Sequence, residues 1–420
     1  MQSSIKLRLT VMNFLQFAVW GAYLTSMGRY LGTAGFGSEI GNFYAMQGLV
    51  SLFMPALMGI VADRWIPAQR LLGLCHMIAG ALMMGVFLYT QTDAASYPTL
   101  FALYSLSVAF YMPTLALSNS VAYTSLEQAG LDLVKSFPPI RVFGTVGFIC
   151  TMITVSLVGV EATSGQFAVS GIIGLVLAVY SQTLPNCPTA PKGQSKSLVE
   201  ALGLRAFVLF KERKMALFFI FSMLLGVSLQ ITNGFANPFI STFGEIPAYA
   251  DTFGVKHANI LISLSQLSET LCILLIPFAL RRFGIRRVML IAMTAWVLRF
   301  ALLGLGDPGS GVWLFLLSMI VYGVAFDFFN VSGSLFVDKE TDPSIRSSAQ
   351  GLFMIMTNGI GATLGSLGAQ AVINYFVNSE HDTTAILAGW SMSWYVFAAY
   401  AAVVTVLFAL LFRYKTETEA

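Results

Sequence analysis

Long apolar stretches recur along the whole chain, and each is followed by a shorter polar or charged segment. A stretch of ~20 apolar residues can span the ~30 Å hydrocarbon core of a bilayer as a helix, because each residue adds ~1.5 Å. The stretches are continuous and lack the alternation that is typical of strands in a membrane barrel. The pattern therefore predicts an all-α membrane protein with twelve transmembrane helices, at residues 8–29, 40–62, 71–91, 97–119, 138–160, 166–184, 215–238, 257–280, 287–305, 311–335, 346–376 and 390–412.

The longest polar interruption lies between the predicted sixth and seventh helices. It divides the chain into an N-terminal six-helix bundle (1–184), a cytoplasmic linker (185–214) and a C-terminal six-helix bundle (215–420). The halves repeat weakly, because a short basic turn follows the second helix of each, GIVADRWIPAQR at 59–70 and ALRRFGIRR at 279–287. Two six-helix halves joined by a cytoplasmic loop are the plan of the major facilitator fold.

The composition agrees with a membrane protein, since 56% of the residues are hydrophobic and only 10% are charged. Lysines and arginines concentrate in the segments that lie inside if both termini are cytoplasmic, for example Arg64, Arg70, Lys211 and Arg281. This bias predicts a multi-pass protein with cytoplasmic termini. It also explains the net charge of +3 without a nucleic-acid partner.

Signatures of enzymes and metal sites are weak in this sequence. The four cysteines and three histidines are scattered without a metal-binding spacing, which predicts free thiols, no metal and no cofactor. GLGDPG at 304–309 fits GxGxxG, but it follows a membrane helix and lies in a turn rather than in a βαβ unit. No HExxH or GxSxG occurs. We therefore expect a protein that is not an enzyme.

Ionisable residues inside the predicted helices are costly in a bilayer, which makes them candidate functional residues. Glu269 precedes Arg281 by twelve residues, or ~18 Å of continuous helix, which predicts a position near the bilayer midplane. Asp327 precedes Asp338 by eleven residues, which predicts a similar depth. The members of this set are Arg141, Glu269, Arg299 and Asp327.

Two arginines of this set are predicted away from the midplane. Pro138 and Pro139 suggest a helix start, which puts Arg141 near the cytoplasmic surface unless the helix begins earlier. Arg299 is expected nearer the outer end, as a possible member of a structural ion pair, and the sequence assigns it no role.

Polar and aromatic residues accompany these charges at helical spacing. Amides that donate and accept hydrogen bonds, next to aromatic faces, suit a polar, neutral solute that contains a ring. Hydrogen bonds between helices and aromatic packing are the alternative explanation for such residues. The groups that share a helix face are Gln266 with Glu269, Gln230 with Asn233, Arg141 with Thr145, and Tyr322 with Phe326, beside which Asp327 lies.

A midplane carboxylate can change between its protonated and ionised forms as its access alternates between the two sides, which is what a proton-coupled carrier requires. We expect Asp327 to pair with Arg141 in one state and to exchange this pairing for protonation or substrate contact. From the residues alone, a proton-coupled sugar symporter is supported almost equally well. A nutrient sensor with a transporter fold and an intramembrane enzyme are further alternatives.

Several segments carry a specific resemblance, among them NFLQFAVWGAYLTSMGRY, FPPIRVFGTVGF, SQLSETL and SMIVYGVAFDFFNVSGSLFVDKE. They resemble the nucleoside:proton symporters of the major facilitator superfamily, which lie in bacterial inner membranes. The resemblance implies uptake of nucleosides driven by the proton gradient, by alternating access, in a monomer without a cofactor. Nucleosides, protons and the lipid bilayer are the partners that it implies.

The resemblance also implies a set of substrate-binding residues. Amides and Glu269 would hold ribose hydroxyls and base edges, and aromatic rings would stack on the base. Asp327 is favoured for proton coupling, with Glu269 as the other candidate. The implied substrate-binding residues are Arg141, Thr145, Gln230, Asn233, Gln266, Glu269, Tyr322, Phe326 and Asp327.

Overall fold

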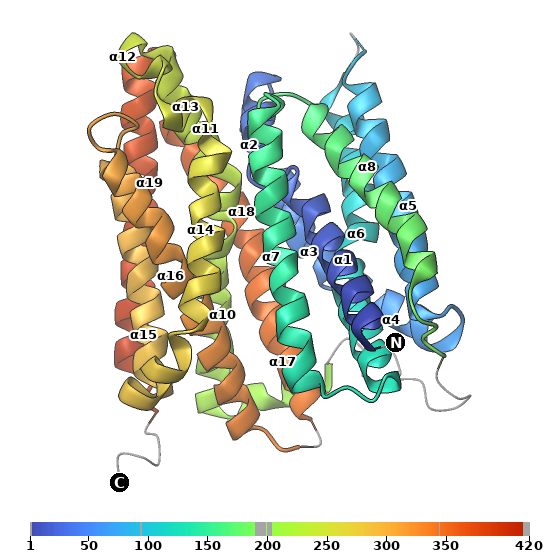
Figure 1. The fold of residues 1–420 in the computed structure, drawn as a ribbon. Helices are drawn as coiled ribbons and strands as arrows, with labels where there is room; N and C mark the ends of the chain where they lie inside the picture. Colours follow the sequence, from blue (N-terminus) through green and yellow to red (C-terminus); the bar gives the residue numbers. More distant parts are fainter. Residues whose placement is uncertain (1, 93–94, 190–198, 200–203, 344, 415–420) are drawn as a thin grey trace. The chain divides into compact units, whose positions relative to one another are not determined.

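A computed structural model describes residues 2–92, 95–189, 199, 204–343 and 345–414 (Figure 1). Within these residues the regular secondary structure is helical and no strand occurs. The chain separates into two compact units, unit 1 (residues 1–30 and 49–202) and unit 2 (residues 31–48 and 203–420). Residues 190–198 and 200–203 of the predicted linker lie outside the described part of the chain.

Unit 1 is a helical bundle in which α5 packs on α6 and α8, and α1 packs on α7 (Figure 1). Its interior holds an apolar cluster that includes Leu9, Leu72, Cys75 and Val121. The helices of unit 1 are α1 (Gln2–Gly21), α4 (Met54–Arg64), α5 (Ala68–Tyr89), α6 (Tyr97–Gln128), α7 (Leu133–Leu157) and α8 (Gly165–Tyr180), while α2 (Met27–Thr33) and α3 (Ile40–Ser51) extend across the unit boundary.

The predicted first helix is interrupted, because α1 ends at Gly21 and α2 begins only at Met27. The hydroxyl of Ser170 donates a hydrogen bond to the carbonyl of Val19 over 2.8 Å. The backbone N–H of Tyr23, the usual donor to that carbonyl, instead reaches the carbonyl of Trp20. A side chain from α8 therefore replaces the helical hydrogen bond at the break.

The ends of the predicted second span agree with an apolar helical segment from Gly37 to Arg64, although its helix is interrupted, whereas the predicted start of the fifth helix is wrong. The second helix is divided into α3 and α4, and Pro55, which lacks a backbone N–H, stands in the first turn of α4. The fifth helix begins at Leu133, so Pro138 and Pro139 lie inside it rather than at its start. Arg141 is consequently well within α7, deeper along the helix than the position of the prolines predicted.

Unit 2 has a core rich in aromatic rings, in which Phe218 packs against Phe336 and Phe353 with ring centroids 4.6 and 5.4 Å away. Helix α15 packs on α16 and α19, and α14 packs on α16 (Figure 1). The helices are α10 (Arg213–Leu229), α11 (Ile231–Thr242), α12 (Pro247–Ala250), α13 (Phe253–Lys256), α14 (Ala258–Ile273), α15 (Ile276–Leu305), α16 (Val312–Glu340), α17 (Arg346–Met354), α18 (Ala362–Phe376) and α19 (Thr383–Leu411), with a π-helical segment, Ile355–Gly361, between α17 and α18.

The predicted eighth helix does not continue to Arg281. Helix α14 ends at Ile273, and α15 begins at Ile276 and contains a left-handed glycine, Gly284, with φ of 74°. Glu269 lies in the last turns of α14, so the estimate of its depth from a continuous helix was based on a wrong assumption. Asp327, by contrast, lies near the middle of α16, a continuous helix of 29 residues.

Turns next to the helices are shaped by short polar side chains. The carboxylate of Asp307 accepts hydrogen bonds from the backbone N–H groups of Gly309 and Gly311 over 2.7 and 3.1 Å. The GxGxxG match thus lies in the turn between α15 and α16, as predicted. Asp382 caps α19 by accepting from the N–H groups of Thr384 and Ala385.

The four cysteines are free thiols, as predicted. Cys187 lies after α8, where its backbone N–H donates to the side chain of Gln69 over 3.0 Å. Burial raises the pKa of the Cys187 thiol, which keeps it protonated and unreactive.

Ten helical segments among the described residues are long and apolar enough to cross a membrane. Lipid chains are as apolar as leucine, so close packing is a principal force that holds such helices together. Glycine permits the closest approach: a Cβ atom on Gly365 of α18 would collide with the carbonyl group of Val227 on α10. The chain is therefore a multi-pass helical membrane protein whose packing depends on particular glycines.

We expect Gly365→Ala to lower the melting temperature of the protein, because the added methyl group overpacks the contact between α10 and α18 at a cost of about 1–3 kcal/mol. Gly368→Ala is the matched control on the same helix, since a Cβ atom there meets nothing within 4 Å. Thermal unfolding of the purified protein in detergent measures both. Equal melting temperatures for the two variants would contradict the proposed contact.

Candidate functional site

Arg141 of unit 1 is held against α1. Its guanidinium carbon lies over the ring of Phe17, 4.1 Å from the centroid, which is the geometry of a cation–π interaction. Gly144 makes room for this arrangement, because a Cβ atom there would lie 2.6 Å from the Phe17 ring and 2.8 Å from Nη1 of Arg141. Arg141 and Thr145 are both half-buried on α7. The position of the Arg141 charge thus depends on how firmly α1 is placed.

A buried chain of hydrogen bonds holds this part of α1. Nε2 of Gln16 donates to the hydroxyl of Thr114 over 2.7 Å, and that hydroxyl donates to the carbonyl of Tyr111. Oε1 of Gln16 therefore faces His76 and accepts from its Nε2 over 2.7 Å. The hydroxyl of Tyr111 donates to the carbonyl of Gln16 over 2.9 Å. These side chains fasten α1 to α5 and α6 one residue before Phe17.

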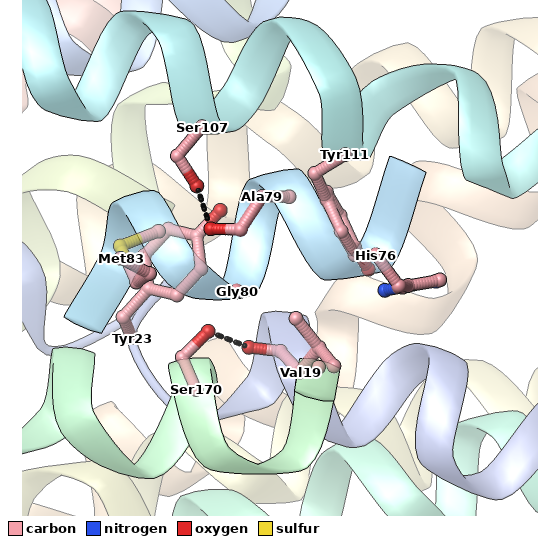
Figure 2. Close-up of a pocket in the computed structure, with 10 residues that line it drawn as sticks. Val19, Tyr23, His76, Ala79, Gly80, Met83, Ser107, Tyr111 and Ser170 are labelled. Atoms are coloured by element: carbon pink, nitrogen blue, oxygen red, sulfur yellow. Dashed lines mark hydrogen bonds between the residues drawn. The ribbon is translucent and has the colours of Figure 1, made fainter. Parts of the chain in front are cut away.

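Beside this hydrogen-bond network lies a small cavity, lined by Val19, Tyr23, His76, Ser107 and Ser170 among others (Figure 2). Its volume is about 10 Å³, roughly the room that one water molecule needs. Pockets for ligands of the size of a nucleoside are about 300 Å³ or more. This cavity is therefore part of the interior of unit 1 and not a substrate site.

In unit 2, α14 and α16 bring most of the predicted site residues together. The side chain of Tyr322 lies next to Gln266, Glu269 and Asp327. The rings of Tyr322 and Phe326 are nearly parallel, at 13°, with centroids 5.6 Å apart. The helices approach closely because Gly323 has no side chain: a Cβ atom there would lie 2.5 Å from the carbonyl oxygen of Ser268.

The site residues on α14 and α16 fall into a half-buried group and a buried group. Gln266, Glu269 and Phe326 are half-buried, whereas Tyr322 and Asp327 are each only 6% exposed. The half-buried groups can reach a solute, while Tyr322 and Asp327 are held by their surroundings. The arrangement combines a hydrogen-bonding edge, a pair of parallel rings and two carboxylates.

Gln230 and Asn233 form a separate pair at the break between α10 and α11. Gln230 is the residue between the two helices, and Nδ2 of Asn233 donates to its Oε1 over 2.9 Å. Both side chains are half-buried. The sequence predicted their common face but not the helix break that lies at Gln230.

Comparison with known proteins identifies the family. The sequence model described as nucleoside H+ symporter matches residues 3–417. The chain belongs to the nucleoside H+ symporter family. It is 48% identical to xanthosine permease of Escherichia coli (strain K12), over 99% of this chain and 98% of the relative, and 45% identical to nucleoside permease NupG of the same organism, over 98% and 97%.

Solved structures agree with this family assignment. A crystal structure of an aspartate-to-alanine mutant of the nucleoside transporter NupG has a TM-score of 0.91 and 44% identity, covering 97% of this chain and 100% of that chain. The predicted family and the major facilitator fold are therefore confirmed, and the relatives are permeases rather than enzymes. A bacterial homologue of the lysosomal transporter Spinster, at 15% identity and a TM-score of 0.69, shows the fold alone.

The structure of this symporter assigns a different environment to Arg299 than the sequence suggested. Its side chain is 2% exposed, and among the described residues it forms no salt bridge. The expected ion pair is therefore absent there. Its guanidinium carbon instead lies 4.6 Å from the centroid of the Tyr322 ring.

The sequence did not predict how two residues contact the predicted site. Phe17 was not singled out, and Arg299 was a candidate to which the sequence assigned no role, yet each contacts a predicted site residue. Gln16 and His76 are polar residues in apolar helices, and this was the available signal, yet they are 60 positions apart in the chain. Only the packing of α1 on its neighbours reveals that they form one network.

Proposed function

We propose that this chain carries nucleosides together with protons across the bacterial inner membrane by alternating access. The observation that carries this conclusion is the match to the nucleoside H+ symporter family along residues 3–417. The names of the relatives, xanthosine permease and nucleoside permease, support nucleosides as the substrate class.

The groups gathered in unit 2 are suited to a nucleoside. The amide of Gln266, the pair of Gln230 and Asn233, and the carboxylate of Glu269 can bind ribose hydroxyls and the edges of a base. The half-buried Phe326, parallel to Tyr322, supplies an aromatic face for the base. From unit 1, we assign Arg141 and Thr145 to the same substrate.

Asp327 is the best candidate for the proton. It lies near the middle of a 29-residue membrane helix and is 6% exposed. A carboxylate in such a place is stable as an ion only with compensating partners, so its protonation can be coupled to a change in access. Glu269 is half-buried at the end of α14, a place better suited to gripping substrate.

For the membrane topology we propose twelve helices with both termini cytoplasmic. The ten long apolar segments become twelve when α1 and the shorter apolar helix α14 are added. We further propose two six-helix bundles, 1–184 and 215–420, joined by a cytoplasmic linker at 185–214, in a protein that works as a monomer. The concentration of lysines and arginines in the cytoplasmic segments supports this orientation.

Counterflow and uptake in proteoliposomes test the function. We expect labelled uridine to exchange against a panel of unlabelled nucleosides that includes xanthosine, and to accumulate when a pH gradient is imposed, alkaline inside. Competition by free ribose, with none by nucleosides, would instead indicate the sugar symporter. Exchange of nucleosides that never accumulates under a pH gradient would contradict proton coupling.

A further inference from the structure

Arg299 is a buried cation that links α14, α15 and α16. Nη1 donates to the carbonyl of Ser318 on α16 over 2.7 Å, and both terminal nitrogens lie 3.4–3.5 Å from the hydroxyl of Ser265 on α14. The hydroxyl of Ser318 donates back to the carbonyl of Arg299 over 3.0 Å. These contacts hold the guanidinium in one place next to Tyr322, one of the predicted site residues.

Packing alone is a poor explanation for this residue. The side chain is 2% exposed, forms no salt bridge among the described residues, and its Nε has no hydrogen-bond partner there. Removing a charge from water is costly unless it is paired, and an apolar side chain of similar size would fill the space without that cost. The positive charge therefore points to a task that an apolar residue cannot perform.

The neighbour that can use this charge is Tyr322. The guanidinium lies over a face of the Tyr322 ring, 4.6 Å from the centroid, and Trp296 contacts the ring edge-on at 5.9 Å and 87°. A desolvated guanidinium over an aromatic face is strongly attractive and orients the ring, since the interaction depends on the plane of both groups. The Tyr322 ring in turn lies parallel to the ring of Phe326, and its side chain lies next to Gln266.

We propose that Arg299 is a positioning residue for substrate binding. It fixes the plane of the Tyr322 ring, and Tyr322 then holds the parallel face of Phe326 and the neighbouring amide of Gln266, which receive the substrate. Arg299 does not touch the substrate itself. This inference rests on the proposed function, because it assigns Gln266 and Phe326 to the nucleoside.

The test compares variants of Arg299 in reconstituted protein. Arg299→Met keeps an unbranched, flexible side chain, shorter by two atoms, and removes the charge, so we expect the KM for the transported solute to rise about 10-fold with Vmax within about twofold. Arg299→Lys keeps the charge but loses the planar guanidinium, and we expect KM to increase about threefold. Transport by the unmodified protein is measured first and tests the proposed function. The ratios of the KM of each variant to that of the unmodified protein are then measured with whichever solute the protein carries.

Arg286→Met is the matched control. Arg286 lies on the same helix and donates hydrogen bonds to the carbonyls of Phe412 and Ala409, both over 2.7 Å, without serving any predicted site residue. We expect it to lower the melting temperature without changing KM. An Arg299→Met variant that behaves in the same way, less stable with an unchanged KM, would overturn the proposal.

A double-mutant cycle with Tyr322→Leu tests the route of the effect. If Arg299 acts through the ring, replacing it in the Tyr322→Leu background should change KM less than twofold, because the group that it positions is already gone. A full 10-fold increase in that background would overturn the proposal. Should Arg299→Met fail to fold, the same cycle is run with Arg299→Lys. An unchanged KM for Arg299→Lys in the protein that retains Tyr322 would then overturn the proposal.

Discussion

Replacing Asp327 with asparagine is expected to abolish the accumulation of nucleosides against their gradient when a pH gradient is imposed. Asparagine keeps the size and the hydrogen-bonding oxygen of the side chain but cannot take up and release a proton. Counterflow, which exchanges solutes without net proton movement, should be retained. The two modes are measured side by side in proteoliposomes loaded at alkaline pH.

Asp338→Asn is the control on the same helix. Asp338 lies near the end of α16, is half-exposed, and pairs with Arg346 at 3.2 Å. An exposed pair of this kind contributes only about 0–1 kcal/mol, so accumulation should be nearly unchanged. Normal pH-driven accumulation in Asp327→Asn would remove Asp327 from the coupling mechanism.

Replacing Glu269 with glutamine is expected to weaken nucleoside binding about 10- to 100-fold. A carboxylate accepts hydrogen bonds from ribose hydroxyls with a strength of about 1.5–3 kcal/mol each, which a neutral amide does not match. Both counterflow and accumulation should therefore fall together, through a higher KM. Binding of a nucleoside to the purified protein, measured by calorimetry, gives the same quantity without transport.

Glu380→Gln serves as the control, because Glu380 is exposed outside the helices and should tolerate the change. The comparison with Asp327→Asn separates gripping the substrate from carrying the proton. If Glu269→Gln retained its affinity but lost only the pH-driven accumulation, Glu269 rather than Asp327 would be the proton carrier.

The sequence predicted the helical class and the approximate positions of most helices, because the length of an apolar run is a local property. It could not predict the interruptions of those helices. The break after Gly21 depends on the hydroxyl of Ser170, which lies 151 positions after its partner Val19 in the chain. Helix α14 ends at Ile273, inside an apolar run that looked continuous, so the depth of Glu269 cannot be calculated from a continuous helix that reaches Arg281.

The candidate site was predictable where its residues share one helix face. Gln266 with Glu269, and Tyr322 with Phe326, were recognised by spacing alone, and the structure brings these pairs together through the close approach of α14 and α16 at Gly323. Arg299 could not be interpreted in this way. Its partners lie on other helices, and the ion pair expected for it does not exist among the described residues.

From the amino-acid sequence alone one can predict that this protein crosses a membrane as helices, belongs to a nucleoside symporter family and carries carboxylates and amides at helical spacing. The helical class and the shared helix faces follow from run length, residue type and periodicity, which depend on neighbours within a few turns. The family follows instead from the resemblance of whole segments such as SQLSETL. The positions of the helix breaks and the contacts of each polar group are visible only once the chain is folded. Arg141 over Phe17 and Arg299 over Tyr322 are contacts between separate helices, so their energies depend on packing that no local pattern records.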